Sequence, residues 1–379
     1  MSTTSKGLEG VVAAETVISH VDGEAGALIY GGYSIEDLAE NTTFEEVCHL
    51  LWFGDLPNRD QLQTVRARLA GSMHVDGKIL DVIRLIAAGT HPMATLRTAV
   101  SALAATDPDA EDMSPEANER KSIRLTAQAI TLTAAIERIR RGRDPLEPRS
   151  DLSLAANLLY MMDGEEPDGL AERIIDAALI LHAEHGMNAS TFAARVTAGT
   201  LADMHSAITS AIGTLKGPLH GGANERVMKM LLQVGTPENA APWVRAALAR
   251  GEKIMGFGHR VYRTLDPRAP ILKKLAEELG RRGGDTRWLQ ISENIETVMR
   301  EEMEKKGKQI YPNVDFFSAS VYYTLGIPLD LFTNLFACAR IAGWTAHVME
   351  QLRDNRLIRP KASYLGHRDR KVTPIAQRA

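Results

Sequence analysis

The 379-residue sequence has few of the residues that build covalent or metal-based frameworks. It contains only two cysteines, Cys48 and Cys338, which are far apart and lie in apolar surroundings. They form neither a metal-ligand pattern nor a disulfide framework, and free cysteines are typical of a reducing compartment. We therefore expect a cytoplasmic protein.

Long apolar runs and blocks of one charge are also absent. No uncharged stretch approaches the roughly 20 residues of a membrane-spanning helix, and the first residues lack the apolar core of a signal peptide. The net charge is −4, with Lys and Arg spread along the whole chain. These absences argue against a membrane protein and against a protein that binds nucleic acid.

The residues that are present indicate a globular, mainly helical, all-α protein. With 44% hydrophobic and 24% charged residues, the chain is long enough for a large core and more than one domain. β-branched residues at 15–21 and an apolar run at 27–30, separated by a turn that contains Gly23, predict a small N-terminal β-hairpin.

The rest of the chain predicts helices, because apolar residues recur at three- and four-residue spacing. Ser34 is a candidate cap for the first helix, and Thr43 with Glu46 forms a candidate capping box for the second. The expected helices cover 35–39, 43–51, 62–70, 79–88, 93–105, 115–142, 152–162, 174–184, 201–213 and 329–349. The segment 221–320 is more charged and lies between two apolar helices, which favours a smaller lobe inserted into a larger core.

His220 is the first candidate for proton chemistry. It lies between Gly217-Pro218 and Gly221-Gly222, just before an expected helix. Unpaired N–H groups at a helix N-terminus disfavour positive charge, so a neutral imidazole could donate a hydrogen bond to a developing oxyanion. The alternative is a histidine that caps a turn, although paired glycines allow a close approach to a ligand.

His259 is the second candidate, in the segment Gly256-Phe257-Gly258-His259. Its two glycines look like a phosphate loop, but the rest of that fingerprint is missing. Arg260, Arg263 and Arg268 follow, and arginines bind carboxylates and phosphates through paired hydrogen bonds. A solvated basic face is the alternative.

Asp315 is the third candidate, because it precedes the apolar rings of Phe316 and Phe317. Desolvation by such rings would raise its pKa and make it a better base near neutral pH. The alternative is the N-cap of a helix over 316–325. His182 and His185, three residues apart, lack a third ligand nearby, so we expect no metal site.

These three segments together closely resemble the catalytic segments of citrate synthases. They are Gly-Pro-Leu-His-Gly-Gly-Ala-Asn (217–224), Gly-Phe-Gly-His-Arg-Val-Tyr (256–262) with Asp-Pro-Arg (266–268), and Tyr-Pro-Asn-Val-Asp (311–315). The resemblance extends to 183–191, 91–100 and 7–11, and so covers nearly the whole chain in family order.

The resemblance implies a helical homodimer of the short bacterial and archaeal type. The large domain would comprise 1–217 and 322–379, with a small domain inserted at 218–321 that closes over the substrate. The implied reaction condenses acetyl-CoA with oxaloacetate and hydrolyses citryl-CoA, without a metal or redox cofactor.

The resemblance also assigns roles by position. Asp315 would be the base, His220 would hold the thioester oxygen, and His259 would polarise the ketone of oxaloacetate. The implied oxaloacetate ligands are His185, Arg268, Arg340 and Arg359, the last in a segment that the family donates across the dimer. The implied CoA contacts are Arg263, Gly256, Phe257, Gly258, Lys306 and Lys308.

Arg340 supports an anion site independently of the resemblance, because it lies in an apolar helix where an unpaired charge would be costly. A bound anion and an internal ion pair both satisfy that requirement.

Two alternative functions remain open. A 2-methylcitrate synthase uses propionyl-CoA with the same residues, and one methylene is worth only about 1–3 kcal/mol in a hydrophobic pocket. A non-catalytic, CoA-binding regulatory paralogue would be marked by loss of His220, His259 or Asp315, and all three are present.

Overall fold

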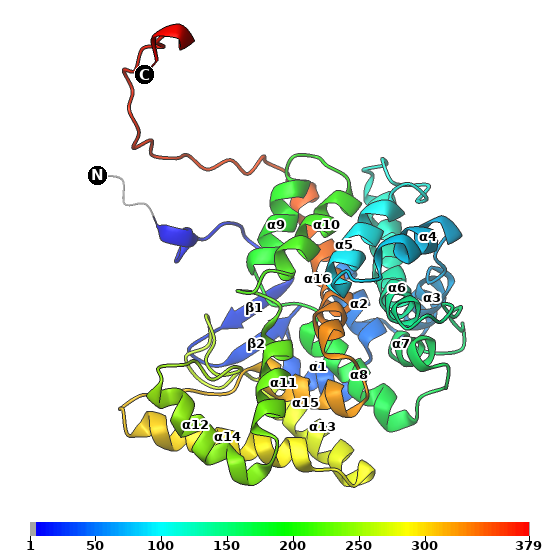
Figure 1. Cartoon of the computed structure of the whole chain (residues 1–379). Helices are drawn as coiled ribbons and strands as arrows, with labels where there is room; N and C mark the ends of the chain where they lie inside the picture. The colour runs from blue at the N-terminus through cyan, green and yellow to red at the C-terminus, as the bar shows by residue number, and fades with distance from the viewer. Residues whose placement is uncertain (1–4, 379) are drawn as a thin grey trace.

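The computed structural model describes residues 5–378, which form sixteen α-helices and one small sheet (Figure 1). The prediction of a mainly helical protein is confirmed. No helix among these residues is long and apolar enough to cross a membrane.

The N-terminal sheet has three antiparallel strands in the order β1 (Ser19–Asp22), β2 (Ala27–Tyr30) and β3 (Tyr33–Ser34). The register pairs Ser19 with Tyr30 and Asp22 with Ala27, which confirms the expected hairpin. The third strand was not predicted, because its two residues are too few to show alternation.

The first helices begin where their capping residues predicted. Ser34 accepts a hydrogen bond from Asp37 N–H at the start of α1 (Ile35–Asn41). At α2 (Phe44–Phe53), the Glu46 carboxylate accepts the Thr43 N–H at 2.8 Å, as in a capping box.

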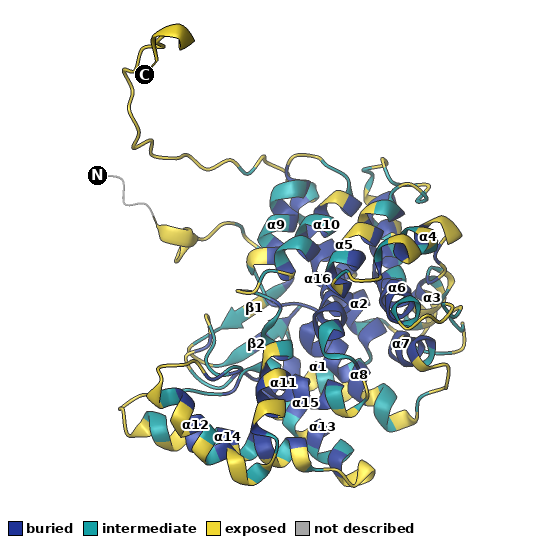
Figure 2. Cartoon of the chain, in the orientation of Figure 1, coloured by how far each residue is buried: buried dark blue, intermediate teal, exposed yellow. Residues whose placement is uncertain are grey.

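The large helical body is built around α16 (Phe332–Arg353), which is buried along most of its length (Figure 2). It packs against α2, α5, α6, α8, α9 and α10. The surrounding helices are α3 (Arg59–Gly71), α4 (Gly77–Ile86), α5 (Pro92–Leu103), α6 (Pro115–Arg140), α7 (Leu154–Asp163), α8 (Gly169–His182), α9 (Ala189–Ala198) and α10 (Met204–Leu215). All except α9 were expected, with ends displaced by a few residues.

Five further helices lie beside one another below this body in Figure 1. They are α11 (Ala223–Val234), α12 (Ala240–Ala249), α13 (Arg268–Gly283), α14 (Arg287–Glu304) and α15 (Val314–Thr324). Helix α15 packs on α11 and α13, and α12 packs on α14. Four of them fall within the segment 218–321 for which a separate small domain was predicted, and α15 runs three residues past its end.

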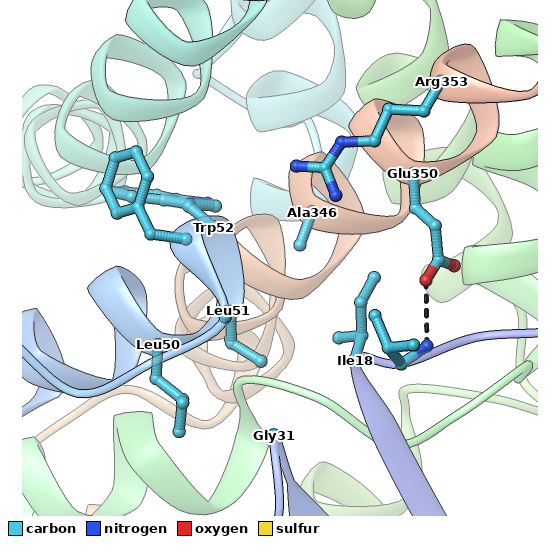
Figure 3. Close-up of a pocket in the computed structure, with 11 residues that line it drawn as sticks. Ile18, Gly31, Leu50, Leu51, Trp52, Ala346, Glu350 and Arg353 are labelled. Atoms are coloured by element: carbon cyan, nitrogen blue, oxygen red, sulfur yellow. Dashed lines mark hydrogen bonds between the residues drawn. The ribbon is translucent and has the colours of Figure 1, made fainter.

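The C-terminal end of α16 contacts the N-terminal segment of the chain. Near its C-terminal end, Glu350 Oε1 accepts the backbone N–H of Val17 at 3.0 Å and so ties the N-terminal segment to the body (Figure 3). The cavity beside this contact measures about 60 Å³. Asn355 still donates to Gly199 O, and beyond Arg356 the chain runs away from the body as an exposed arm (Figure 1).

Candidate active site

The segments of His259 and Asp315 are locked together by backbone pairing. Gly258 N–H donates to Tyr311 O at 2.9 Å, and Asn313 N–H donates to Gly256 O at 2.9 Å. Gly256 has a φ of +81°, and a Cβ there would lie 2.7 Å from the ring of Phe316, so only glycine fits. The glycines therefore permit this pairing rather than form a phosphate loop.

A cavity of about 210 Å³ opens beside the paired segments. Its lining comes from both of them and from the loop that leads to α13: Gly258, His259, Tyr262, Arg263, Thr264, Asp266 and residues 309–313.

His259 is held in one tautomer by the backbone. Its Nδ1 accepts the N–H groups of Val261 at 3.1 Å and Tyr262 at 3.2 Å. Burial, with Arg268 nearby, lowers the pKa of His259 to about 4, so the ring is neutral at pH 7. Because Nδ1 accepts, the single proton lies on Nε2, which makes Nε2 a hydrogen-bond donor.

Asp315 is not the N-cap of its helix, so that alternative was wrong. The cap is Asn313, whose Oδ1 accepts the Asp315 N–H at 3.1 Å, because α15 begins earlier than the expected 316. Burial raises the pKa of Asp315 to about 6, against the opposing charge of Arg268. The expected desolvation of this carboxyl agrees with its burial.

His220 lies in the loop between α10 and α11, ahead of the first residue of α11. Burial and then the charge of Arg340 lower its pKa to about 4, so this imidazole is neutral too. The neutral state agrees with the expectation, and burial is its largest cause. Its Nε2 lies 2.8 Å from Ser190 Oγ.

His185 joins these groups from the loop between α8 and α9. It is 9% exposed, and its Nε2 lies 3.1 Å from the hydroxyl of Tyr262. Its ring is 5.2 Å from that of His259, centroid to centroid. Burial and Arg268 hold the pKa of His185 well below its usual range. The structure thus brings together two of the histidines expected around one substrate.

Arg340 is a buried cation on α16. It is 1% exposed, its Nε donates to His182 O at 2.7 Å, and its guanidinium lies 4.7 Å from the ring centroid of Phe336. Within residues 5–378 it forms no salt bridge, and burial lowers its pKa to about 10. Of the two explanations left open by the sequence, the internal ion pair is therefore wrong for this part of the chain.

Arg268 has a different arrangement at the start of α13. Its Nε and Nη2 donate to the two oxygens of Asp266 at 2.9 and 2.8 Å. Asp266 Oδ2 also accepts the Val314 N–H at 3.1 Å, beside Asp315. Because Arg260 and Arg263 are exposed whereas Arg268 is buried, the three arginines do not form a single basic face.

Known proteins with a similar sequence and fold identify the family of this chain. The family model described as "Citrate synthase, C-terminal domain" matches residues 7–361. The chain belongs to the citrate synthase family. It is 50% identical over 378 residues to citrate synthase 2 of Bacillus subtilis, covering 100% of both chains. It is 46% identical to a 2-methylcitrate synthase of Mycobacterium tuberculosis, covering 96% of this chain and 91% of that protein.

Solved structures agree with this family. Citrate synthase from Pyrobaculum aerophilum superposes with a TM-score of 0.93 at 43% identity, covering 98% of this chain and 95% of that one. The enzyme from Thermoplasma acidophilum, solved with carboxymethyl coenzyme A and oxaloacetate, gives a TM-score of 0.93 at 34% identity over 100% of both chains.

Two of the residues expected to contact CoA, Gly258 and the exposed Arg263, line the cavity. Phe257 pairs with Pro312, which also lines it, and Gly256 is buried. Lys306 and Lys308 are exposed just after α14, next to the lining residues 309–313.

Arg359 is an expected site residue that the structure does not bring to the others within this chain. It is exposed in the C-terminal arm, and no hydrogen bond or salt bridge joins its side chain to another described residue. The described part of the chain also contains no group of three or more His, Cys, Asp or Glu side chains arranged for a metal ion.

Several residues around the site were not singled out from the sequence. Tyr262 contacts His185, Asp266 pairs with Arg268, and Ser190 contacts His220. Trp344 on α16 donates to Ser190 Oγ at 3.1 Å. The Asn188-x-Ser190 sequence does signal a helix N-cap, but the contact with Trp344 crosses 154 residues and leaves no local signal.

A series of buried side chains, linked by hydrogen bonds and a salt bridge, supports the loop that carries His185. Glu184 accepts from His347 Nε2 at 3.1 Å, and Arg195 Nη1 lies 3.2 Å from His347 Nδ1 and 2.5 Å from Glu350. Helix α16 approaches this loop so closely that a Cβ on Gly343 would lie 2.3 Å from Ala183 O.

Proposed function

We propose that this member of the family is a citrate synthase, which condenses acetyl-CoA with oxaloacetate and hydrolyses citryl-CoA to citrate and CoA. The observation that carries the proposal is the combination of one carboxylate with a raised pKa, in a segment paired with that of a neutral imidazole, and a second neutral imidazole in the loop before α11. The 50% identity to a citrate synthase over the full length supports it.

Asp315 would remove a proton from the methyl group of acetyl-CoA. A carboxyl pKa of about 6 leaves the group ionised at neutral pH while making it a stronger base than an ordinary aspartate. His220, neutral and half-buried, would hold the thioester oxygen as negative charge develops on it.

His259 would polarise the ketone of oxaloacetate through its Nε2–H, whose proton is fixed by the backbone bonds to Nδ1. His185, Arg268, Arg340 and Arg359 would hold the two carboxylates. Arg340 supplies the buried positive charge that requires an anion, whereas Arg268 would bind through N–H groups that Asp266 does not use.

The CoA part of the acyl substrate would lie along the cavity beside His259. The proposed CoA contacts are Arg263, the backbone of 256–258, and Lys306 and Lys308.

We propose that 218–321 forms a small domain that closes over 1–217 and 322–379, as the mutual packing of α11–α15 supports. The proposed steps move protons and join carbons, which requires neither a metal nor a redox cofactor.

We also propose a cytoplasmic homodimer. Two buried free cysteines fit a reducing compartment. The exposed arm that carries Arg359 supports a dimer in which each chain completes the site of the other.

The deciding experiment measures release of CoA thiol by the purified protein with oxaloacetate and either acetyl-CoA or propionyl-CoA. We expect release with both and a higher kcat/KM for acetyl-CoA. A higher value for propionyl-CoA would make the protein a 2-methylcitrate synthase, and no release with either would overturn the enzymatic proposal. Asp315→Ala should abolish turnover while oxaloacetate still binds, as calorimetry would show.

A further inference from the structure

Trp344 is the largest fully buried side chain of the described residues, and its only polar atom points at the site. It follows Arg340 by about one turn on α16, so one face of this helix presents both side chains. The indole Nε1–H donates to Ser190 Oγ at 3.1 Å. Ser190 is itself fully buried and lies 2.8 Å from His220 Nε2.

The hydrogen bonds of the Ser190 hydroxyl can be assigned completely. Trp344 can only donate, so it occupies one lone pair of Ser190 Oγ. Asn188 Oδ1 lies 2.7 Å away and also accepts the N–H groups of Ser190 and Thr191, both at 3.1 Å. Its amide nitrogen faces the carbonyl oxygens of residues 185 and 186, which fixes the orientation of the amide.

The assignment determines the tautomer of His220. Because Asn188 Oδ1 can only accept, the single Ser190 proton points to Asn188, and one lone pair of Ser190 remains. That lone pair can only meet a protonated Nε2, so His220 carries its proton on Nε2 and its Nδ1 is bare. A donor to a thioester oxygen on the open side of the ring would instead need the proton on Nδ1.

We propose that Trp344 is a positioning residue for the reaction. Its N–H holds the Ser190 oxygen in place, while the Ser190 hydroxyl proton can point in either of two directions. In the ligand-free protein the hydroxyl points to Asn188, and His220 is protonated on Nε2. When the acyl thioester binds, the hydroxyl turns to His220 Nε2, and the ring proton is exchanged through solvent to Nδ1, where it meets the thioester oxygen. The ring gains one proton and loses one, so no charge changes. The change on binding of the acyl thioester rests on the proposed function, whereas the tautomer in the ligand-free protein does not.

The ligand-free tautomer is tested by NMR of the full chain labelled with ¹⁵N-histidine, with His220→Gln identifying the signals of His220. We expect a directly bonded proton on Nε2 and none on Nδ1. A proton on Nδ1 in the ligand-free protein would overturn the inference, whether or not the protein is an enzyme.

The role of Trp344 is tested by Trp344→Phe, which removes the N–H and keeps most of the apolar ring. We expect kcat to fall about tenfold, as for the loss of one hydrogen bond, with an unchanged KM for oxaloacetate. Trp52→Phe is the matched control, because Trp52 is also buried and donates to Ala342 O and Thr345 Oγ1 of α16. It should lose similar thermal stability but keep kcat, and equal kcat losses in the two variants would contradict the proposal.

A double-mutant cycle separates a positioning role from a general packing role. If Trp344 acts through Ser190, the double variant Trp344→Phe/Ser190→Ala has the same kcat as Ser190→Ala alone. Independent, multiplicative losses would show that Trp344 acts by another route. If Trp344→Phe does not fold, Ser190→Ala and Ser190→Thr replace it: the NMR spectrum should show both tautomers without the hydroxyl and one tautomer with it.

Discussion

At the scale of single residues, burial decides which groups are charged. It lowers the pKa of His220 and His259 to about 4 and raises that of Asp315 to about 6. The same removal from water therefore gives two neutral donors and one strengthened base, because desolvation always disfavours the charged form. Without the lowered pKa values of the histidines the site would lack its neutral donors, and without the raised pKa of Asp315 it would lack its strengthened base.

The pH dependence of turnover follows from Asp315. Protonation below its pKa removes the base, so kcat/KM for acetyl-CoA should fall about tenfold per pH unit below pH 6 and level off above it. His220 and His259 are already neutral there and should add no step near pH 7. The profile is measured by thiol release between pH 4.5 and 8.5, and a midpoint near 7 would instead point to a histidine as the base.

The ionised, desolvated Asp315 should lower the free energy of unfolding of the protein. Its pKa is higher in the folded state, about 6, than the ordinary 3.8, so the destabilisation is complete above pH 6 and disappears below about pH 4. Asp315→Asn should therefore abolish turnover and raise the free energy of unfolding by up to about 3 kcal/mol at pH 8.

Denaturant unfolding at pH 8 and pH 5 measures this gain, which should shrink at pH 5. Asp369→Asn in the exposed arm is the control and should change neither value. A gain that is the same at both pH values would show that charge is not its cause.

At the scale of elements, the sequence predicted helices well and their contacts poorly. Apolar periodicity identified most of the ten helical segments because apolar residues at helical spacing are buried, and the capping residues Ser34 and Thr43 located two of the starts. Helix α9 was missed because its Ala, Ser and Thr residues form no apolar stripe.

For the site as well, the sequence predicted the candidate residues better than their contacts. His220, His259 and Asp315 could be identified because Gly and Pro mark their loops and because the motifs occur in family order. The N-cap prediction for Asp315 failed because a nearby competitor, Asn313, is an equally good cap. The contact of Ser190 with Trp344 depends on how α16 packs against α9, which local pattern does not encode.

The packing of α16 against the His185 loop gives a prediction for this element. In Gly343→Ala, the new Cβ would lie 2.3 Å from Ala183 O and 2.4 Å from Glu184 Oε2, so helix and loop must separate. We expect a loss of about 1–3 kcal/mol in the free energy of unfolding. The KM for oxaloacetate should rise as well, because Arg340 and His185 lie on the two elements that move apart.

Gly71→Ala is the control, since nothing lies within 4 Å of a Cβ at that position in α3. Alanine there should be neutral or stabilise the helix by up to about 1 kcal/mol. Equal effects of the two substitutions in thermal unfolding would show that the close approach at Gly343 is unimportant.

At the scale of the whole molecule, the exposed arm explains why one expected residue stands apart. His259 and Asp315 belong to segments of one chain that are paired through their backbones, and Arg340 lies in the core of the same chain. Arg359 alone is on a segment that leaves the body. A site that is complete only in the dimer can be tested by mixing inactive chains, since each chain then supplies what the other lacks.

Arg359→Ala and His259→Ala should each be nearly inactive as homodimers. After mixing and exchange of subunits, the proposed arrangement puts an intact His259 and an intact Arg359 in one of the two sites of every mixed dimer. Random exchange makes half of the dimers mixed, so thiol release should recover to roughly a quarter of the wild-type value. The pair His259→Ala and Asp315→Ala should not recover, because both residues serve the same site from the same chain. If the first pair also stays inactive, Arg359 serves its own chain or none, and the exposed arm needs a different explanation.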